Sequence, residues 1–154
     1  MGRIISPVSV QNPFKPDMML VVNALVDAGA SNMFLPDSLR HKLGEIEELE
    51  PAFCTFADGS KTLAKRFGPV KIQIEGFPKI YNEVIFLPPD PNGNDIEPIV
   101  GYIVLEQSRV GVDMVGHRLI KIDSFDLKGT QYSEQERSLD AFKQSQLKEK
   151  AEAK

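Results

Sequence analysis

One aspartate stands where an apolar segment ends abruptly. Residues 22–26 are mostly apolar, Asp27 follows them, residues 28–30 read Ala-Gly-Ala, and a second apolar run begins at Met33. A carboxylate at the end of a buried strand is costly unless it is hydrogen-bonded or serves in chemistry. The small residues beside it leave room for a ligand or another backbone segment. Asp27 is therefore the leading candidate for a chemical role, with an ordinary turn aspartate as the alternative.

Other reactive side chains are scattered along the chain. Cys54 lies in an apolar segment, whereas His41 and His117 lie among surface-type residues in separate elements. A thiol–histidine pair is therefore disfavoured, and a buried, inert thiol is expected. Residues 90–101 carry the aspartates and asparagines of a calcium loop, but the glycine falls at the fourth position and Gly101 replaces the final glutamate. We predict a solvated loop there, and neither a metal nor another cofactor.

Composition limits the class of protein. The chain has 154 residues, 42% of them hydrophobic and 26% charged, which fits a soluble globular domain with a real core. A net charge of −4 disfavours nucleic acid as the main partner, because phosphate binding needs a basic surface. No apolar run approaches the ~18 residues of a membrane span, and no secretory signal is expected. A single cysteine excludes an internal disulfide, so we expect a cytoplasmic protein.

The elements that position Asp27 follow from the apolar pattern. Continuous apolar runs and alternation with a period of two both predict strands. These strands cover residues 8–10, 18–26, 31–35, 53–57, 62–67, 70–75, 80–87, 112–115 and 118–122. The run 18–26 is too uniformly apolar to have a solvated face. Short helices are predicted over 36–44 and 102–110, and 88–98 is a proline-rich loop. The pattern indicates an all-β fold, a small closed β-barrel with two short helices.

We place this barrel in residues 1–125. The remainder, residues 126–154, is almost wholly polar and rich in helix-forming Glu, Lys, Gln and Ala. Leu139, Phe142 and Leu147 are its larger apolar residues, and three such residues cannot bury a whole helical stripe. We expect a frayed helix or a disordered tail.

Several segments together resemble the retropepsin-like aspartic peptidases, over about residues 8–123. Leu25-Val26-Asp27-Ala28-Gly29-Ala30 resembles the family's apolar strand that runs into Asp-Thr/Ser-Gly-Ala. Met33-Phe34-Leu35-Pro36, followed later by Leu43-Gly44, resembles the continuation in bacterial members. Ile99-Val100-Gly101 resembles the second signature, two apolar residues and a glycine that open a helix. The chain is therefore identified as a bacterial-type member with the retropepsin barrel.

This resemblance implies an aspartic endopeptidase, a hydrolase that acts as a homodimer. Two Asp27 carboxylates, one from each subunit, would share a proton and activate a water to hydrolyse a peptide bond. Gly29, Ala30 and Ser31 would border the peptide or protein substrate. The hairpin at Asp58-Gly59 falls where the family has its flap and would close over that substrate. Neither a cofactor nor a metal is implied.

The chain departs from the family at Ala28, where threonine or serine is expected. In the family that hydroxyl hydrogen-bonds across the two-fold axis and holds both aspartates, and an alanine methyl cannot replace it. Losing a buried hydrogen bond costs on the order of 1 kcal/mol. We therefore expect a looser dimer and impaired activity. The alternative is a catalytically inactive dimeric module of this fold that binds a protein or peptide, and a monomeric β-scaffold is a third hypothesis.

Overall fold

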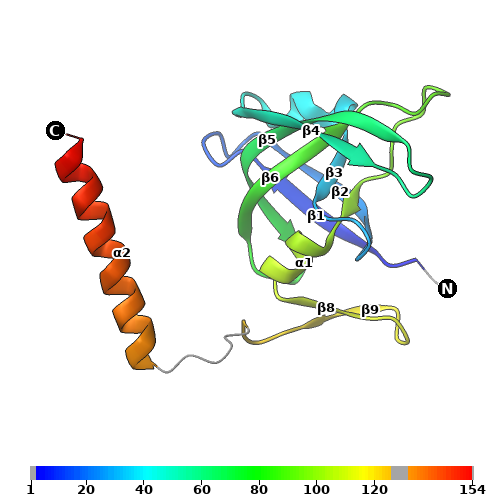
Figure 1. The fold of residues 1–154 in the computed structure, drawn as a ribbon. Helices are drawn as coiled ribbons and strands as arrows, with labels where there is room; N and C mark the ends of the chain where they lie inside the picture. Colours follow the sequence, from blue (N-terminus) through cyan, green and yellow to red (C-terminus); the bar gives the residue numbers. More distant parts are fainter. Residues whose placement is uncertain (1–2, 126–131, 154) are drawn as a thin grey trace. The chain divides into compact units, whose positions relative to one another are not determined.

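A computed structural model of the chain describes residues 3–125 and 132–153. The chain divides into two units, residues 1–123 and 124–154. In chain order, the first unit contains β1 (Ile5–Gln11), β2 (Met19–Val26), β3 (Met33–Pro36), the 3₁₀ helix η1 (Asp37–Leu43), β4 (Glu48–Thr55), β5 (Lys61–Ile74), β6 (Ile80–Leu87), β7 (Ile99–Val100), α1 (Tyr102–Gln107), β8 (Val110–Asp113) and β9 (Arg118–Lys121) (Figure 1).

Seven strands form one strongly curved sheet (Figure 1). Their order is β1-β2-β7-β3-β6-β5-β4, and β1 also pairs with β5 from Val8↔Ile74 to Gln11↔Lys71. Among the described strands, β4 has a neighbour on one side only, so the sheet keeps an open edge. β8 and β9 form a separate two-stranded hairpin. The prediction of a β-rich fold is therefore confirmed, but the seven strands do not all close into a barrel.

The two faces of the β5–β6 pair carry two different apolar clusters. Val84 and Phe86 belong to the main core, which lies on one face. Ile85 and Leu87 alternate with them and therefore point to the opposite face. There they form a smaller cluster with Ala64, against which Phe34, Cys54 and Ile96 pack. The smaller cluster lies under the site described below.

Several strands differ from their predicted bounds, β4 among them with a start at Glu48, and β5 and β2 also differ in form. The sequence predicts separate strands on either side of Gly68 and Pro69, but β5 runs unbroken through both residues. Its pairing with β6 shifts register between Phe67 and Val70, so an irregularity absorbs the extra residues without ending the strand. The prediction that β2 lacks a solvated face is wrong, because Met19 is 48% and Val21 64% exposed. β2 alternates between a buried and an exposed face, as strands of antiparallel sheets do.

Both predicted short helices exist, with changes. The segment 36–44 forms the 3₁₀ helix η1, and Gly44 follows it with φ +67°, a conformation that favours glycine. The helix predicted over 102–110 ends at Gln107. It stops early because Val110 and Gly111 pair with β9 and so belong to β8.

The second unit contains one long helix, α2 (Tyr132–Glu152). Of the tail predicted over 126–154, residues 126–131 and 154 lie outside the described residues. Leu139, Phe142 and Leu147 are all exposed on it. In the part of the chain that the structure describes, no helix is long and apolar enough to cross a membrane.

Candidate functional site

Asp27 lies directly after β2, in the turn that leads to β3. Its backbone N–H donates to the carbonyl oxygen of Val100 at 3.0 Å, so β7 holds the chain beyond the end of β2. Its Oδ1 accepts a hydrogen bond from the Gly29 N–H at 2.9 Å. Its other carboxylate oxygen, Oδ2, has no hydrogen-bond partner among the described residues. The half-buried side chain thus has one oxygen that fixes the turn and one that is available for proton transfer.

Gly101 joins the loop of residues 27–32 to the start of α1. The Gly101 N–H donates to the carbonyl oxygen of Asn32 at 2.9 Å, and the next two N–H groups of α1 donate to Ala30 at 2.8 Å and to Ser31 at 2.9 Å. These donors have no partner inside the helix, so the loop satisfies them. A Cβ at position 101 would lie 2.4 Å from the carbonyl oxygen of Ala30, so only glycine allows this approach. The two segments singled out in the sequence are therefore in direct backbone contact.

The loop opens onto a cleft of about 790 Å³. Asp27 and residues 29–32 contribute to its lining, as do residues 52–57 of β4 and its hairpin. The smaller apolar cluster contributes Phe34, Ile85 and Leu87, which form the apolar floor of the cleft. A mostly apolar cleft with a few convergent polar groups is typical of a binding site.

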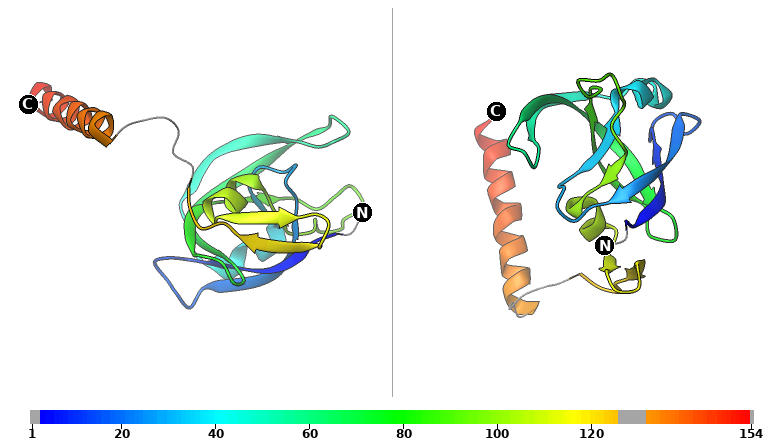
Figure 2. Two further views of the ribbon diagram at one scale, coloured as in Figure 1. Left: turned by 90° about the horizontal axis from the view of Figure 1, so that it is seen from below. Right: turned by 90° about the vertical axis from the view of Figure 1, so that its right-hand side faces the viewer.

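The predicted substrate-binding residues fall into two groups. Gly29, Ala30 and Ser31 line the cleft together with Asp27. Asp58 and Gly59 do not line it. They lie at the tip of the β4–β5 hairpin, which projects from the sheet (Figure 2).

Local hydrogen bonds shape this hairpin tip. The backbone N–H and the hydroxyl of Ser60 donate to Asp58 Oδ1 at 2.8 Å and 2.6 Å. These bonds lower the pKa of Asp58 from its ordinary value of 3.8. Gly59 has φ +85° and open space around it. The tip is thus defined by its own few residues.

Ala28 is exposed and does not line the cleft. Its neighbour Gly29 is also exposed, so the outer side of the turn is uncovered in the single chain. A hydroxyl at position 28 would therefore have to find its partner in another molecule or in solvent.

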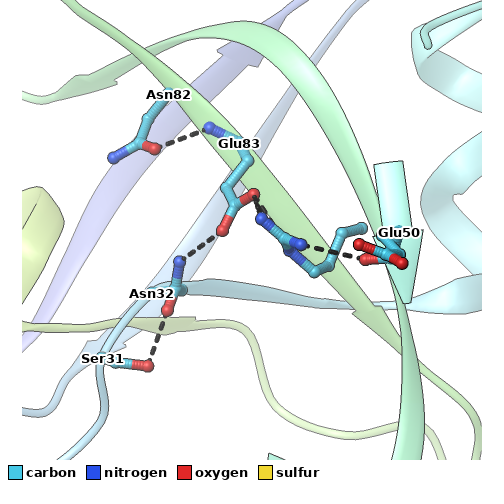
Figure 3. A network of polar contacts seen from close by, with 6 residues as sticks. Ser31, Asn32, Glu50, Asn82 and Glu83 are labelled. Carbon is cyan, nitrogen blue, oxygen red and sulfur yellow. Dashed lines mark hydrogen bonds and ion pairs between the residues drawn. The ribbon is translucent and has the colours of Figure 1, made fainter. Parts of the chain in front are cut away.

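A polar network in the lining of the cleft was not predicted from the sequence (Figure 3). Asn32 Nδ2 donates to Glu83 Oε1 at 3.1 Å, and the Ser31 hydroxyl donates to Asn32 Oδ1 at 2.6 Å. Arg66 Nε donates to Glu83 Oε2 at 3.0 Å, and Arg66 Nη1 donates to the carbonyl oxygen of Glu50 at 2.9 Å. The network connects the Asp27 loop to β6, β5 and β4. The one sequence signal that could have drawn attention to it is a glutamate within the mostly apolar run 80–87.

The other reactive groups form no second site. Cys54 lines the cleft, and burial raises the pKa of its thiol, which disfavours the nucleophilic thiolate. His41 Nδ1 lies 2.9 Å from the carbonyl oxygen of Ser38, and His117 lies in the turn between β8 and β9. Within residues 3–125 and 132–153, no group of three metal-ligating side chains could hold an ion.

Comparison with models of known protein families and with curated proteins found no match for this chain. The comparisons therefore assign it neither a family nor an activity.

Proposed function

We propose that the chain is one subunit of a homodimeric aspartic endopeptidase of the retropepsin type. The observation that carries this proposal is the position of Asp27 in the lining of the cleft, with Oδ1 fixed by Gly29 and Oδ2 without a partner in the part of the chain that the structure describes. The contact between the Asp27 loop and Gly101 supports it, since these are the two segments that resemble the family's signatures. The curved β-sheet is compatible with the same assignment.

The proposed chemistry needs a pair of carboxylates. Two Asp27 side chains that face each other across a two-fold axis would share one proton, because like charges at such a separation cannot both ionise readily. The ionised carboxylate accepts a proton from a water held between them, and that water attacks the scissile carbonyl carbon. The protonated carboxylate donates its proton to the carbonyl oxygen. The tetrahedral intermediate then collapses as the leaving nitrogen takes up a proton, with no covalent enzyme intermediate.

The cleft suits an extended peptide. Its volume of about 790 Å³ lies within the range of small-ligand sites and accommodates a few side chains of a peptide. Its apolar floor would take apolar side chains, and the projecting β4–β5 hairpin would cover the bound segment.

A second candidate function follows from Ala28. Without a hydroxyl at this position the paired aspartates lose a hydrogen bond in each subunit, and slight misplacement of catalytic groups lowers rates steeply. A dimeric module of the same fold that binds peptides without cleaving them is therefore the alternative.

Hydrolysis of a pool of fluorescence-quenched peptides distinguishes the two functions. We expect slow cleavage by the unmodified chain and a loss of at least about 100-fold with Asp27→Asn, which removes the general base. Asp113→Asn is the matched control, since Asp113 lies in β8 and outside the cleft. Cleavage that survives Asp27→Asn would exclude the aspartic mechanism. Peptide binding without any cleavage would favour the binding module.

A further inference from the structure

The pair of Arg66 and Glu83 stands out on the floor of the cleft. Arg66 is the register partner of Ile85 across the β5–β6 pair, and Glu83 precedes Ile85 by two residues. All three side chains therefore share the face of the sheet that carries the smaller apolar cluster. Both charged side chains are largely covered, with 29% of Arg66 and 19% of Glu83 exposed. Both also line the cleft, so a ligand there meets them directly.

The side chains of Arg66 and Asn32 keep unused N–H donors in this network. A guanidinium carries five N–H groups, and Arg66 directs three of them to Glu83 and to the carbonyl oxygen of Glu50. The other two have no partner among the described residues. The Asn32 amide gives one N–H to Glu83 and keeps one, while its oxygen already accepts from Ser31. Both carboxylate oxygens of Glu83 are likewise engaged.

The charge of the cleft limits which side chain of a ligand can accept hydrogen bonds from Arg66 and Asn32. The charged residues that line the cleft are Asp27, Arg66 and Glu83, so its lining carries one more negative than positive charge. An acidic side chain would meet two carboxylates and one guanidinium that Glu83 already neutralises. A basic side chain has no acceptor to offer, and an apolar one would leave the unused N–H groups of Arg66 and Asn32 without an acceptor from the ligand. A neutral amide supplies an acceptor without adding charge.

We propose that Arg66, Glu83 and Asn32 form a polar subsite that binds the side-chain amide of a glutamine or asparagine in a peptide. The amide oxygen accepts from Arg66 and Asn32, and the flanking peptide residues pack on the apolar floor. The subsite rests on the proposed function for the identity of its ligand as a peptide. It does not depend on hydrolysis.

Peptide binding to the Asp27→Asn protein tests the subsite without cleavage. The probe is a positional-scanning library of decapeptides, with the bound peptides recovered and identified by mass spectrometry. At one position we expect Gln or Asn to be enriched about fivefold or more over Leu and over Glu, because a site built to hydrogen-bond an amide rejects side chains that lack it. Enrichment of acidic or apolar residues, or no enrichment, would overturn the proposal.

Variants then assign the preference to these residues. Arg66→Met combined with Glu83→Gln removes both charges together, leaves no lone buried charge, and should abolish the enrichment. Arg66→Lys keeps the positive charge but removes the planar guanidinium with its paired N–H donors. This variant should fold unchanged and show a lower enrichment of Gln and Asn. Arg118→Met, which removes the ion pair with Asp113 outside the cleft, is the control and should leave the preference intact. A preference that persists in both Arg66 variants would contradict the assignment.

The two proposals fail in different ways. Amide preference in a protein that hydrolyses no peptide would reject the peptidase and retain the subsite. Hydrolysis by the unmodified chain without any amide preference would retain the peptidase and reject the subsite.

Discussion

The loop that carries Asp27 and the hairpin tip at Asp58 are both short polar turns at strand ends, yet they are held in different ways. Segments distant in the sequence hold the Asp27 loop. A carbonyl of β7 accepts a hydrogen bond from the loop backbone, and N–H groups at the start of α1 donate hydrogen bonds to it. Among the described residues, the hydrogen bonds of the hairpin tip are local: the Gly59 N–H donates to the Phe56 carbonyl at 2.9 Å, the Phe56 N–H donates to the Ser60 carbonyl at 2.8 Å, and Ser60 donates to Asp58. A Cβ at Gly101 has no room, whereas a Cβ at Gly59 meets nothing within 4 Å.

This difference separates a turn that is fixed to the rest of the fold from a turn at the hairpin tip that is free to move. Opening the Asp27 loop would break backbone hydrogen bonds to residues about seventy positions away, so it requires a large part of the fold to open. Opening the hairpin tip breaks bonds between near neighbours, and costs correspondingly little. A catalytic group needs a fixed position, which a turn like the Asp27 loop provides. A segment that covers substrate has to open and close, which a turn like the hairpin tip allows.

The largest effect is expected from alanine at the two glycines. Gly101→Ala forces a methyl group against the carbonyl of Ala30 and should lower the free energy of unfolding by about 3 kcal/mol, with loss of peptide binding. Gly59→Ala meets no atom and is penalised only by its positive φ, roughly 1 kcal/mol. Urea unfolding followed by circular dichroism measures both. Equal losses in the two variants would show that the loop and the tip are held alike.

A smaller effect is expected at Ala28, on the exposed side of the fixed loop. Ala28→Thr supplies the missing hydroxyl, and one hydrogen bond per subunit, about 2 kcal/mol for the dimer, should tighten the dimer by on the order of thirtyfold. Sedimentation equilibrium gives the dissociation constant, and peptide hydrolysis should rise with it. Ala151→Thr, at an exposed position of α2, is the control. An unchanged dimer and unchanged hydrolysis would refute the role assigned to position 28.

The smallest effect concerns the pH dependence of the hairpin tip. Hydrogen bonds from Ser60 depress the pKa of Asp58 below 3.8, so the ordered tip is favoured above that pH and loses this contribution as the pH falls through the depressed pKa. The Ser60 amide resonance in NMR spectra should therefore shift with a midpoint below 3.8. Ser60→Ala removes the hydroxyl bond and should raise the Asp58 midpoint, observed at its side-chain carboxyl. A midpoint that Ser60→Ala leaves unmoved would show that this hydroxyl does not hold the tip.

Much of the fold was predictable because it depends on local apolar patterns. The runs that form β2 and β6 were found within a residue or so of their ends, and the glycine of Ile99-Val100-Gly101 correctly marked the start of a helix. The continuity of β5 was not predictable, since Gly68 and Pro69 usually end a strand and only the pairing with β6 accommodates them.

The candidate site was predictable only in part. Asp27 and its small neighbours form a contiguous segment, so their pattern was visible in the sequence. The network of Asn32, Arg66 and Glu83 joins three segments, and Asn32 and Glu83 are fifty-one positions apart in the sequence. No local pattern encodes such a contact, because it arises only when β3, β5 and β6 assemble into one sheet.

The central claim is that each chain carries half of an active site. Subunit mixing tests it most directly: peptide hydrolysis is measured at a constant amount of unmodified chain while the Asp27→Asn chain is added in ninefold excess and the subunits exchange. If two Asp27 carboxylates form one site, random pairing leaves about one tenth of the unmodified chains with an unmodified partner, so activity should fall about tenfold. Activity that the added variant leaves unchanged would contradict the account.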